Sequence, residues 1–289
     1  MRSAAVLSSS GRGLLYAGIA VLFFATSPVF IRWAGTLSSY EITFWRLFIA
    51  TLALALAMRT VGESGRAALA EWRKFTLFGL VTALHFVLYV ASLSFTTIAH
   101  TLSLLYTAPV FVTLFSARFL KEAIPRRKWG GILLATVGIG ILAGFQPRFT
   151  GRMMVGDLLA LGSAIMYALY SVIGRWQRTQ YSLFSYATFV YGTAAIWAAI
   201  PAALAFTPTG YTPLAVLSLL GLGLLPLALG HTLYNAALRR THATYVNIIA
   251  TQEVTGGILL GVLLLGEVPG PNEIFGVVVT LLGVFLVIL

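Results

Sequence analysis

The 289-residue chain is 59% hydrophobic and only 9% charged, whereas soluble domains carry about 25% charged residues. This composition excludes an ordinary soluble protein, and the lack of cysteine excludes disulfides and thiolate chemistry. The net charge of +11 resides mostly in short segments between apolar runs, which is typical of membrane orientation signals, so no nucleic-acid partner is expected.

Ten apolar runs follow one another along the chain, and each is long enough to cross a bilayer core of about 30 Å as a helix. They cover residues 14–33, 39–58, 72–96, 98–120, 128–145, 154–176, 182–206, 213–238, 243–265 and 273–289. Open sheets leave backbone groups unpaired in lipid, so the predicted fold class is an all-α polytopic membrane protein with ten transmembrane helices. The first run leads into Arg32 and a second span, which predicts a retained helix rather than a cleaved signal.

The basic residues concentrate in alternate loops between these runs. With the N-terminus inside, the cytoplasmic segments hold 15 of the 19 basic residues: Arg2, Arg12, Arg59, Arg66, Arg73, Lys74, Arg118, Lys121, Arg126, Arg127, Lys128, Arg175, Arg178, Arg239 and Arg240. The opposite face keeps Arg148 and Arg152 in loops. The positive-inside rule therefore predicts that both termini are cytoplasmic.

An internal repeat relates the two halves of the chain. A shift of 145 positions aligns Leu88-Tyr89-x-Ala91-x-Leu93-x-x-Thr96 with Leu233-Tyr234-x-Ala236-x-Leu238-x-x-Thr241, and it also aligns Glu122, Gly131 and Gly138 with Glu267, Gly276 and Gly283. Each half, residues 1–147 and 148–289, holds five predicted spans. Because five is odd, the second copy is expected to enter the membrane inverted, an arrangement typical of secondary transporters with a central substrate site.

Three stretches carry a family resemblance: "SSYEITFWRLFIATLALA" in the second span, "TAPVFVTLFSARFLKEAI" closing the fourth, and "GGILLGVLLLGEVPGPNEIFGVVVTLLGVFLVIL" at the end. The chain resembles the EamA-type branch of the drug/metabolite transporter superfamily, and is most similar to bacterial inner-membrane aromatic amino acid exporters of the YddG type. The resemblance implies export of aromatic and other neutral amino acids through a cavity between the repeats. Pro109 has Val254 as its counterpart, so a proline-linked hinge is expected in the fourth span and not in the ninth.

Polar side chains form stripes on several of the predicted helices. Spacings of three and four place them on one helix face in each span, which favours a shared cavity over scattered interhelical hydrogen bonds. The candidate substrate-binding or cavity residues are His85, Tyr89, Ser103, Tyr106, Tyr167, Tyr170, Tyr234, Asn235, Gln252 and Glu253. His85, His100 and His231 are also candidates for proton relay, although a histidine within a span can equally be a hydrogen-bonded helix contact.

Ionisable residues within spans are costly, and this makes each of them a functional hypothesis. Arg46 offers a positive charge to a substrate carboxylate, or it pairs with an acid and holds the bundle together; Glu41 lies in the same span. Glu253 offers a site for a substrate ammonium or a coupling proton, or it is a packing residue. Ala108 is its repeat counterpart, so the carboxyl group is not part of the repeated scaffold.

The sequence has no His-Glu-x-x-His, Walker A or Gly-x-Ser-x-Gly motif. We therefore expect no metal, no cofactor and no enzyme activity. The predicted function is export of aromatic amino acids by alternating access, with proton coupling left open. The alternatives are export of other metabolites or organic cations, and a static intramembrane binding protein or enzyme.

Overall fold

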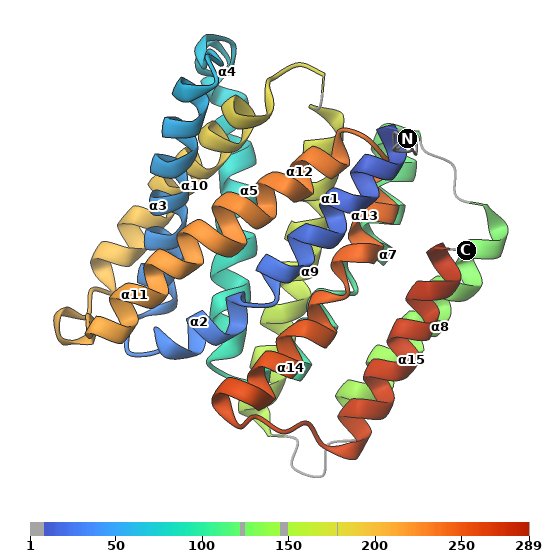
Figure 1. The fold of residues 1–289 in the computed structure, drawn as a ribbon. Helices are drawn as coiled ribbons and strands as arrows, with labels where there is room; N and C mark the ends of the chain where they lie inside the picture. The colour runs from blue at the N-terminus through green and yellow to red at the C-terminus, as the bar shows by residue number, and fades with distance from the viewer. Residues whose placement is uncertain (1–8, 122–124, 145–149, 178, 289) are drawn as a thin grey trace, which may run out of the picture.

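The computed structural model describes residues 9–121, 125–144, 150–177 and 179–288, and these residues form helices and no strand (Figure 1). Arg2, Glu122, Arg148 and Arg178 lie outside them. The first half contains α1 (Ser9–Phe24), α2 (Ser27–Trp33), α3 (Ser39–Thr60), α4 (Arg66–Ala70), α5 (Trp72–Leu93), α6 (Ile98–Leu105), α7 (Ala108–Phe115), η1 (Ser116–Leu120) and α8 (Arg126–Gly144). The second contains α9 (Gly151–Trp176), α10 (Leu183–Leu204), η2 (Pro208–Gly210), α11 (Pro213–Leu222), η3 (Gly223–His231), α12 (Thr232–Leu238), α13 (Ala243–Ala250), α14 (Glu253–Leu265) and α15 (Pro271–Ile288).

Within the described residues, seven continuous helical segments are long and apolar enough to cross a membrane. They are Ser9–Trp33, Ser39–Thr60, Trp72–Leu93, Ile98–Leu120, Gly151–Trp176, Leu183–Leu204 and Pro213–Leu238. The other three predicted spans coincide with α8, with α13 followed by α14, and with α15, where the shorter apolar stretches Trp129–Gly138, Glu253–Leu265 and Ile274–Gly283 occur. The structure therefore describes a membrane protein with at least seven candidate spans, and the count of ten stays a prediction.

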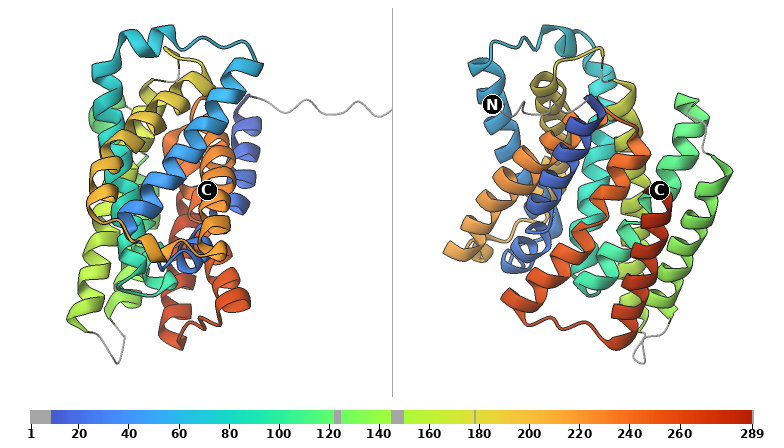
Figure 2. Two further views of the ribbon diagram at one scale, coloured as in Figure 1. Left: turned by 90° about the vertical axis from the view of Figure 1, so that its left-hand side faces the viewer. Right: turned by 45° about the vertical axis from the view of Figure 1, so that its right-hand side comes forward.

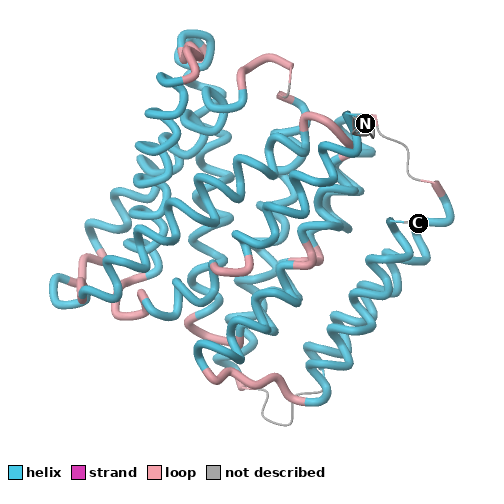
Figure 3. Tube along the Cα trace, in the orientation of Figure 1, coloured by secondary structure: helices cyan, strands magenta, loops and turns pink. Residues whose placement is uncertain are grey.

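Several helices are interrupted near the middle of the bundle, where short pink turns appear in Figure 3. One turn lies at Tyr106 and Thr107, between α6 and α7, and another at Thr251 and Gln252, between α13 and α14. The two turns are 145 positions apart, as are the first and the last residues of α6 and α13. The expectation of a hinge only in the fourth span is wrong, because the ninth breaks at the matching place without a proline.

In two cases, a helix of the first half packs against its counterpart in the second half, and the two run in opposite directions. Glu63, beyond the end of α3, accepts hydrogen bonds from the first N–H groups of α10, whereas Glu41 at the start of α3 accepts from Thr207 beyond the end of α10. At one edge of the bundle α8 lies against α15 (Figure 2). Gly138 contacts Thr280, and Gly283 contacts Ala135, so these helices are also antiparallel. A Cβ at either glycine would meet backbone at 2.4 Å or less, so the missing side chains permit this close approach.

Candidate functional site

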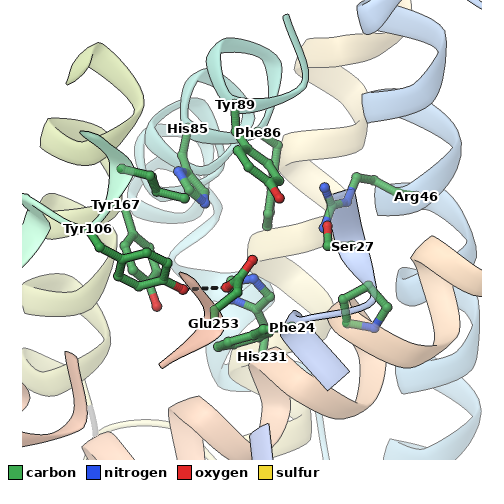
Figure 4. Close-up of a pocket in the computed structure, with 12 residues that line it drawn as sticks. Phe24, Ser27, Arg46, His85, Phe86, Tyr89, Tyr106, Tyr167, His231 and Glu253 are labelled. Carbon is green, nitrogen blue, oxygen red and sulfur yellow. Dashed lines mark hydrogen bonds between the residues drawn. The ribbon is translucent and has the colours of Figure 1, made fainter. Parts of the chain in front are cut away.

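A small cavity lies inside the bundle, next to the helix interruptions before α7 and α14 (Figure 4). Its volume is about 20 Å³, room for about one water molecule. Side chains from both halves line it: Phe24, Ser27, Arg46, His85, Phe86, Tyr89, Leu105, Tyr106, Tyr167, Pro226, His231 and Glu253. Of the predicted candidates, Arg46, His85, Tyr89, Tyr106, Tyr167 and Glu253 are thus brought together.

Arg46 extends from α3 into this cavity and is only 1% exposed. Its guanidinium carbon lies 4.3 Å from the centre of the Phe86 ring, a cation–π arrangement that holds the plane of the side chain. Nε and Nη1 are buried and have no hydrogen-bond partner in the described part of the chain. Buried donors are normally paired. These two N–H groups are therefore free to bind an anionic group that enters the cavity.

Glu253 is the first residue of α14 and faces the cavity from the second half of the chain (Figure 4). Tyr106, in the turn between α6 and α7, donates its hydroxyl hydrogen to a Glu253 carboxylate oxygen. The position at the start of a 13-residue helix also suits a negative charge. Arg46 and Glu253 face one cavity, but no distance of 4.0 Å or less joins their charged atoms in the described structure. Both charges thus remain accessible to a third group.

The two cavity histidines differ in their partners. Ser163 donates its hydroxyl hydrogen to the backbone oxygen of His85 at 2.8 Å and lies 2.9 Å from His85 Nδ1. The serine oxygen must therefore accept from Nδ1, which leaves Nε2 as the acceptor of the neutral ring. His231 is packed between the rings of Phe24 and Phe86, and its Nδ1 has no partner among the described residues. His100 is elsewhere, 3.2 Å from Asp157.

A second polar cluster lies directly behind the cavity. Asn235 donates to the hydroxyl of Tyr170 at 2.7 Å and to that of Tyr191 at 3.2 Å, and Ser171 lies 2.5 Å from the Tyr234 hydroxyl. Rings connect this cluster to the cavity, because Tyr167 packs against both Tyr170 and Tyr234 with centroids 6.2 and 5.6 Å away. The predicted candidates Tyr170, Tyr234 and Asn235 therefore support the cavity wall and do not line it.

Three other candidates lie away from the cavity lining. Ser103 is buried in α6, its hydroxyl unpartnered within the described structure, and Gln252 is exposed at the turn before α14. Glu41 caps α3: it forms a capping box with Ser38, and it accepts from the Thr207 hydroxyl at 2.7 Å and the Tyr211 hydroxyl at 2.9 Å. The carboxylate therefore ties the start of α3 to the segment after α10 and does not neutralise Arg46.

Sequence reasoning did not select several residues that line the cavity, namely Phe24, Ser27, Phe86, Leu105 and Pro226. Four of them are apolar residues in apolar helices, where hydropathy gives no contrast between lipid-facing and cavity-facing positions. Ser27 offered a weak signal, because near the start of each half a shift of 144 positions aligns it with Ser171, which belongs to the neighbouring polar cluster.

Comparisons with known proteins agree with this architecture. The chain matches the EamA-like transporter family over residues 11–144 and again over residues 154–289. An uncharacterized transporter of Archaeoglobus fulgidus is 24% identical over 280 residues, which cover 94% of this chain and 96% of the relative. The pseudopaline exporter CntI of Pseudomonas aeruginosa is 33% identical over 169 residues, 58% of each chain. A crystal structure aligns with a TM-score of 0.77 over 95% of this chain and 96% of its own, at 19% identity, and so shares the fold. Because the two family matches span most of the sequence, the chain belongs to the EamA-like transporter family and is a multi-pass membrane transporter.

Proposed function

We propose that this transporter exports aromatic amino acids, and other neutral amino acids less well, across the bacterial inner membrane by alternating access. One observation carries the proposal. An unpaired arginine and a carboxylate face the same buried cavity, and aromatic rings fill the space around them.

The arrangement suits the two charges of an amino acid. Arg46 would bind the carboxylate through Nε and Nη1, and Glu253 would bind the ammonium group in exchange for its bond with Tyr106. The stacked rings of His85 and Tyr167, 4.9 Å between centroids, would contact an aromatic side chain. Arg46 weighs against organic cations without a carboxylate, because a buried positive charge repels them.

The small volume of the cavity supports a closed state of the cycle for this structure. About 20 Å³ cannot hold an amino acid, so loading requires the lining helices to separate. The turns at Tyr106 and at Gln252 lie next to cavity residues and interrupt α6–α7 and α13–α14. Half-helices ending at the site are the arrangement by which transporters of this kind bind charged groups.

Two inverted repeats of five spans would supply the two alternating states. The shared boundaries of α6 and α13 support the repeat, and α3 and α10 have bounds 144 positions apart. These two helices run antiparallel, as do α8 and α15, which supports inversion. Because the chain has no cysteine, single cysteines at the exposed positions Gly62 and His242 can be labelled from one side of intact cells. We expect both on the cytoplasmic side; labelling from opposite sides would contradict the inverted repeat.

Counterflow of labelled phenylalanine in proteoliposomes tests the transport activity directly. We expect internal unlabelled phenylalanine to drive uptake of the label, and tyrosine or tryptophan to compete better than alanine. Binding without flux would favour a static intramembrane site. Flux of pseudopaline but of no amino acid would favour the activity for which the Pseudomonas aeruginosa relative is named.

Glu253 would also carry the coupling proton if transport is proton-driven. Its carboxyl group is buried and belongs to only one of the two repeats. We expect an imposed pH gradient to accelerate phenylalanine flux by the wild type, and Glu253→Gln to abolish that acceleration while leaving the expressed amount unchanged. A variant that still responds to the gradient would remove Glu253 from proton coupling. Gln252→Glu, at an exposed position, is the matched control.

A further inference from the structure

A second, larger cavity lies on the side of the bundle, away from the central site. It has a volume of about 710 Å³ and lies between α1, α3, the start of α10, and the continuous helix formed by η3 and α12. We call it the lateral groove. Its lining residues are Tyr16, Ala53, Leu54, Ala57, Leu183, Phe184, Leu224, Leu225, Ala228, Leu229, Thr232, Leu233, Ala236 and Arg240.

Small side chains form much of the groove. Ala53 and Ala57 lie on α3, and Ala228 and Ala236 lie on η3 and α12. From Leu224 to Ala236 the groove follows thirteen residues of helix, about 18 Å from first to last at 1.5 Å per residue, and Arg240 lies in the turn after α12. Half of a bilayer core is about 15 Å thick, so the groove is long enough for the acyl chain of one leaflet.

The groove is apolar along its length and positively charged at one end. Arg240 lies there with Nη1 donating to the Ala236 carbonyl at 2.9 Å and its guanidinium 5.0 Å from the Tyr16 ring. The described residues provide no acidic side chain within 4.0 Å of it. These contacts fix the side chain at the mouth of the groove, where it forms no ion pair with a described residue.

A second arginine, Arg12, lies near this mouth without being one of the groove's lining residues. The Cβ position at Gly13 lies 3.0 Å from Arg240 Cβ, so the start of α1 packs against the end of α12. Arg12 is the neighbour of Gly13 and precedes Tyr16 by four residues, which places it on the same helix face as Tyr16. Figure 1 shows the start of α1 and the end of α12 together at the upper side of the bundle.

We propose that an anionic phospholipid binds in the lateral groove, with an acyl chain between α1, α3 and α12 and its phosphate at Arg240 and Arg12. Basic pockets between transmembrane helices are suited to anionic headgroups, whereas the groove walls accept only hydrocarbon. A zwitterionic phospholipid has the same tails but carries a compensating cation beside its phosphate. The arginines therefore favour a headgroup with a net negative charge, and the apolar groove favours a molecule with an acyl chain.

The position of the groove connects this lipid to the transport cycle. η3 provides Leu224 and Ala228 to the groove, and Pro226 and His231 to the central cavity. α3 likewise provides Ala53 to the groove and Arg46 to the cavity. A bound lipid would hold these helices in the closed arrangement, so its occupancy would affect the rate of opening. The binding proposal itself does not depend on the identity of the substrate.

Native mass spectrometry of delipidated, detergent-purified protein tests the inference with three probes: phosphatidylglycerol, phosphatidylcholine with the same chains, and glycerol phosphate without chains. We expect the wild type to bind phosphatidylglycerol at least ten-fold more tightly than phosphatidylcholine and not to bind glycerol phosphate measurably. Arg240→Gln should weaken the binding of phosphatidylglycerol roughly five-fold. Arg59→Gln, an exposed arginine outside the groove lining, is the matched control and should have no effect.

Two variants that fill the groove, Ala57→Leu and Ala53→Leu, should reduce binding of both phospholipids at unchanged elution volume and helix content. Equal affinity of the wild type for the two phospholipids would overturn the role of the arginines. Undiminished binding in both leucine variants, or glycerol phosphate binding as tight as that of phosphatidylglycerol, would overturn the role of the groove.

Discussion

Replacing Arg46 by lysine tests the proposal that the central cavity binds a substrate carboxylate. Lysine keeps the positive charge but presents a compact ammonium instead of a planar fork of N–H groups. In the structure the fork is held over Phe86 with Nε and Nη1 unpaired, so a carboxylate could accept two parallel hydrogen bonds from it. Arg46→Lys removes that geometry and leaves the net charge of the cavity unchanged.

The expected size of the effect follows from the number of bonds lost. A hydrogen bond that involves a charged group contributes about 1.5–3 kcal/mol. Loss of one such bond corresponds to an affinity change of about 10- to 150-fold. We expect the lower end, because the lysine ammonium can still form a single bond with the carboxylate.

Analogues that lack one charged group make the assay specific. Inhibition constants are measured against counterflow of labelled phenylalanine for phenylalanine itself and for phenethylamine, which has no carboxylate. Arg46→Lys should raise the constant for phenylalanine about ten-fold and change that for phenethylamine less than two-fold. Arg59→Lys, at an exposed position of the same helix, is the control. Equal losses for both ligands would show that Arg46 acts on the fold and would refute carboxylate recognition.

Three further predictions concern stability in detergent. Glu267→Gln should remove the ion pair with Arg32, whose Nε lies 2.7 Å from the carboxylate, and lower the unfolding free energy by at most about 1 kcal/mol because both side chains are partly exposed. Gly283→Ala should lower the unfolding free energy by about 1–3 kcal/mol, because the new Cβ would meet the α8 backbone at 2.2 Å. Gly130→Ala is the control: its Cβ would meet nothing within 4 Å, so this substitution should not destabilise the protein. Burial raises the pKa of Tyr181 from 10.0 to about 12, so the native state keeps a proton that the unfolded chain loses. The contribution of Tyr181 to the free energy of unfolding is therefore fully present below pH 10 and is lost as the pH rises through 12. In denaturant titrations at a series of pH values, Tyr181→Phe should reduce this loss of stability.

Much of the helix layout follows from hydropathy and from the repeat. The Leu-Tyr and glycine matches in the sequence indicate a shift of 145 positions. The same shift separates the last residues of α5 and α12, and the first and last residues of α6 and α13. Hydropathy is informative here because every span must be apolar over a fixed length. It does not reveal the break before Glu253, because threonine and glutamine are tolerated within helices and no proline marks the turn.

The location of single side chains was harder to predict than the helices that carry them. The placement of Gln252 beside Glu253 assumed one continuous helix, but the turn at this point leaves Gln252 exposed. The capping role of Glu41 could be predicted from the sequence, because Ser38 and Glu41 have the spacing of a capping box. Its contacts with Thr207 and Tyr211 could not be foreseen, because they depend on how α10 packs against α3.

The repeat also explains why the chemistry of the site is asymmetric. The turns before α7 and α14 occupy matching positions, but the first residue after the turn is Ala108 in one copy and Glu253 in the other. Tyr106, immediately before Thr107 in the first copy, donates to that glutamate across the interface between the halves. A scaffold with two equivalent turns thus supplies a carboxylate from one repeat and its hydroxyl partner from the other. Any motion that separates the halves must break this bond. In the proposed mechanism, a substrate ammonium that took the place of the Tyr106 hydroxyl would therefore also remove one contact that holds the halves together.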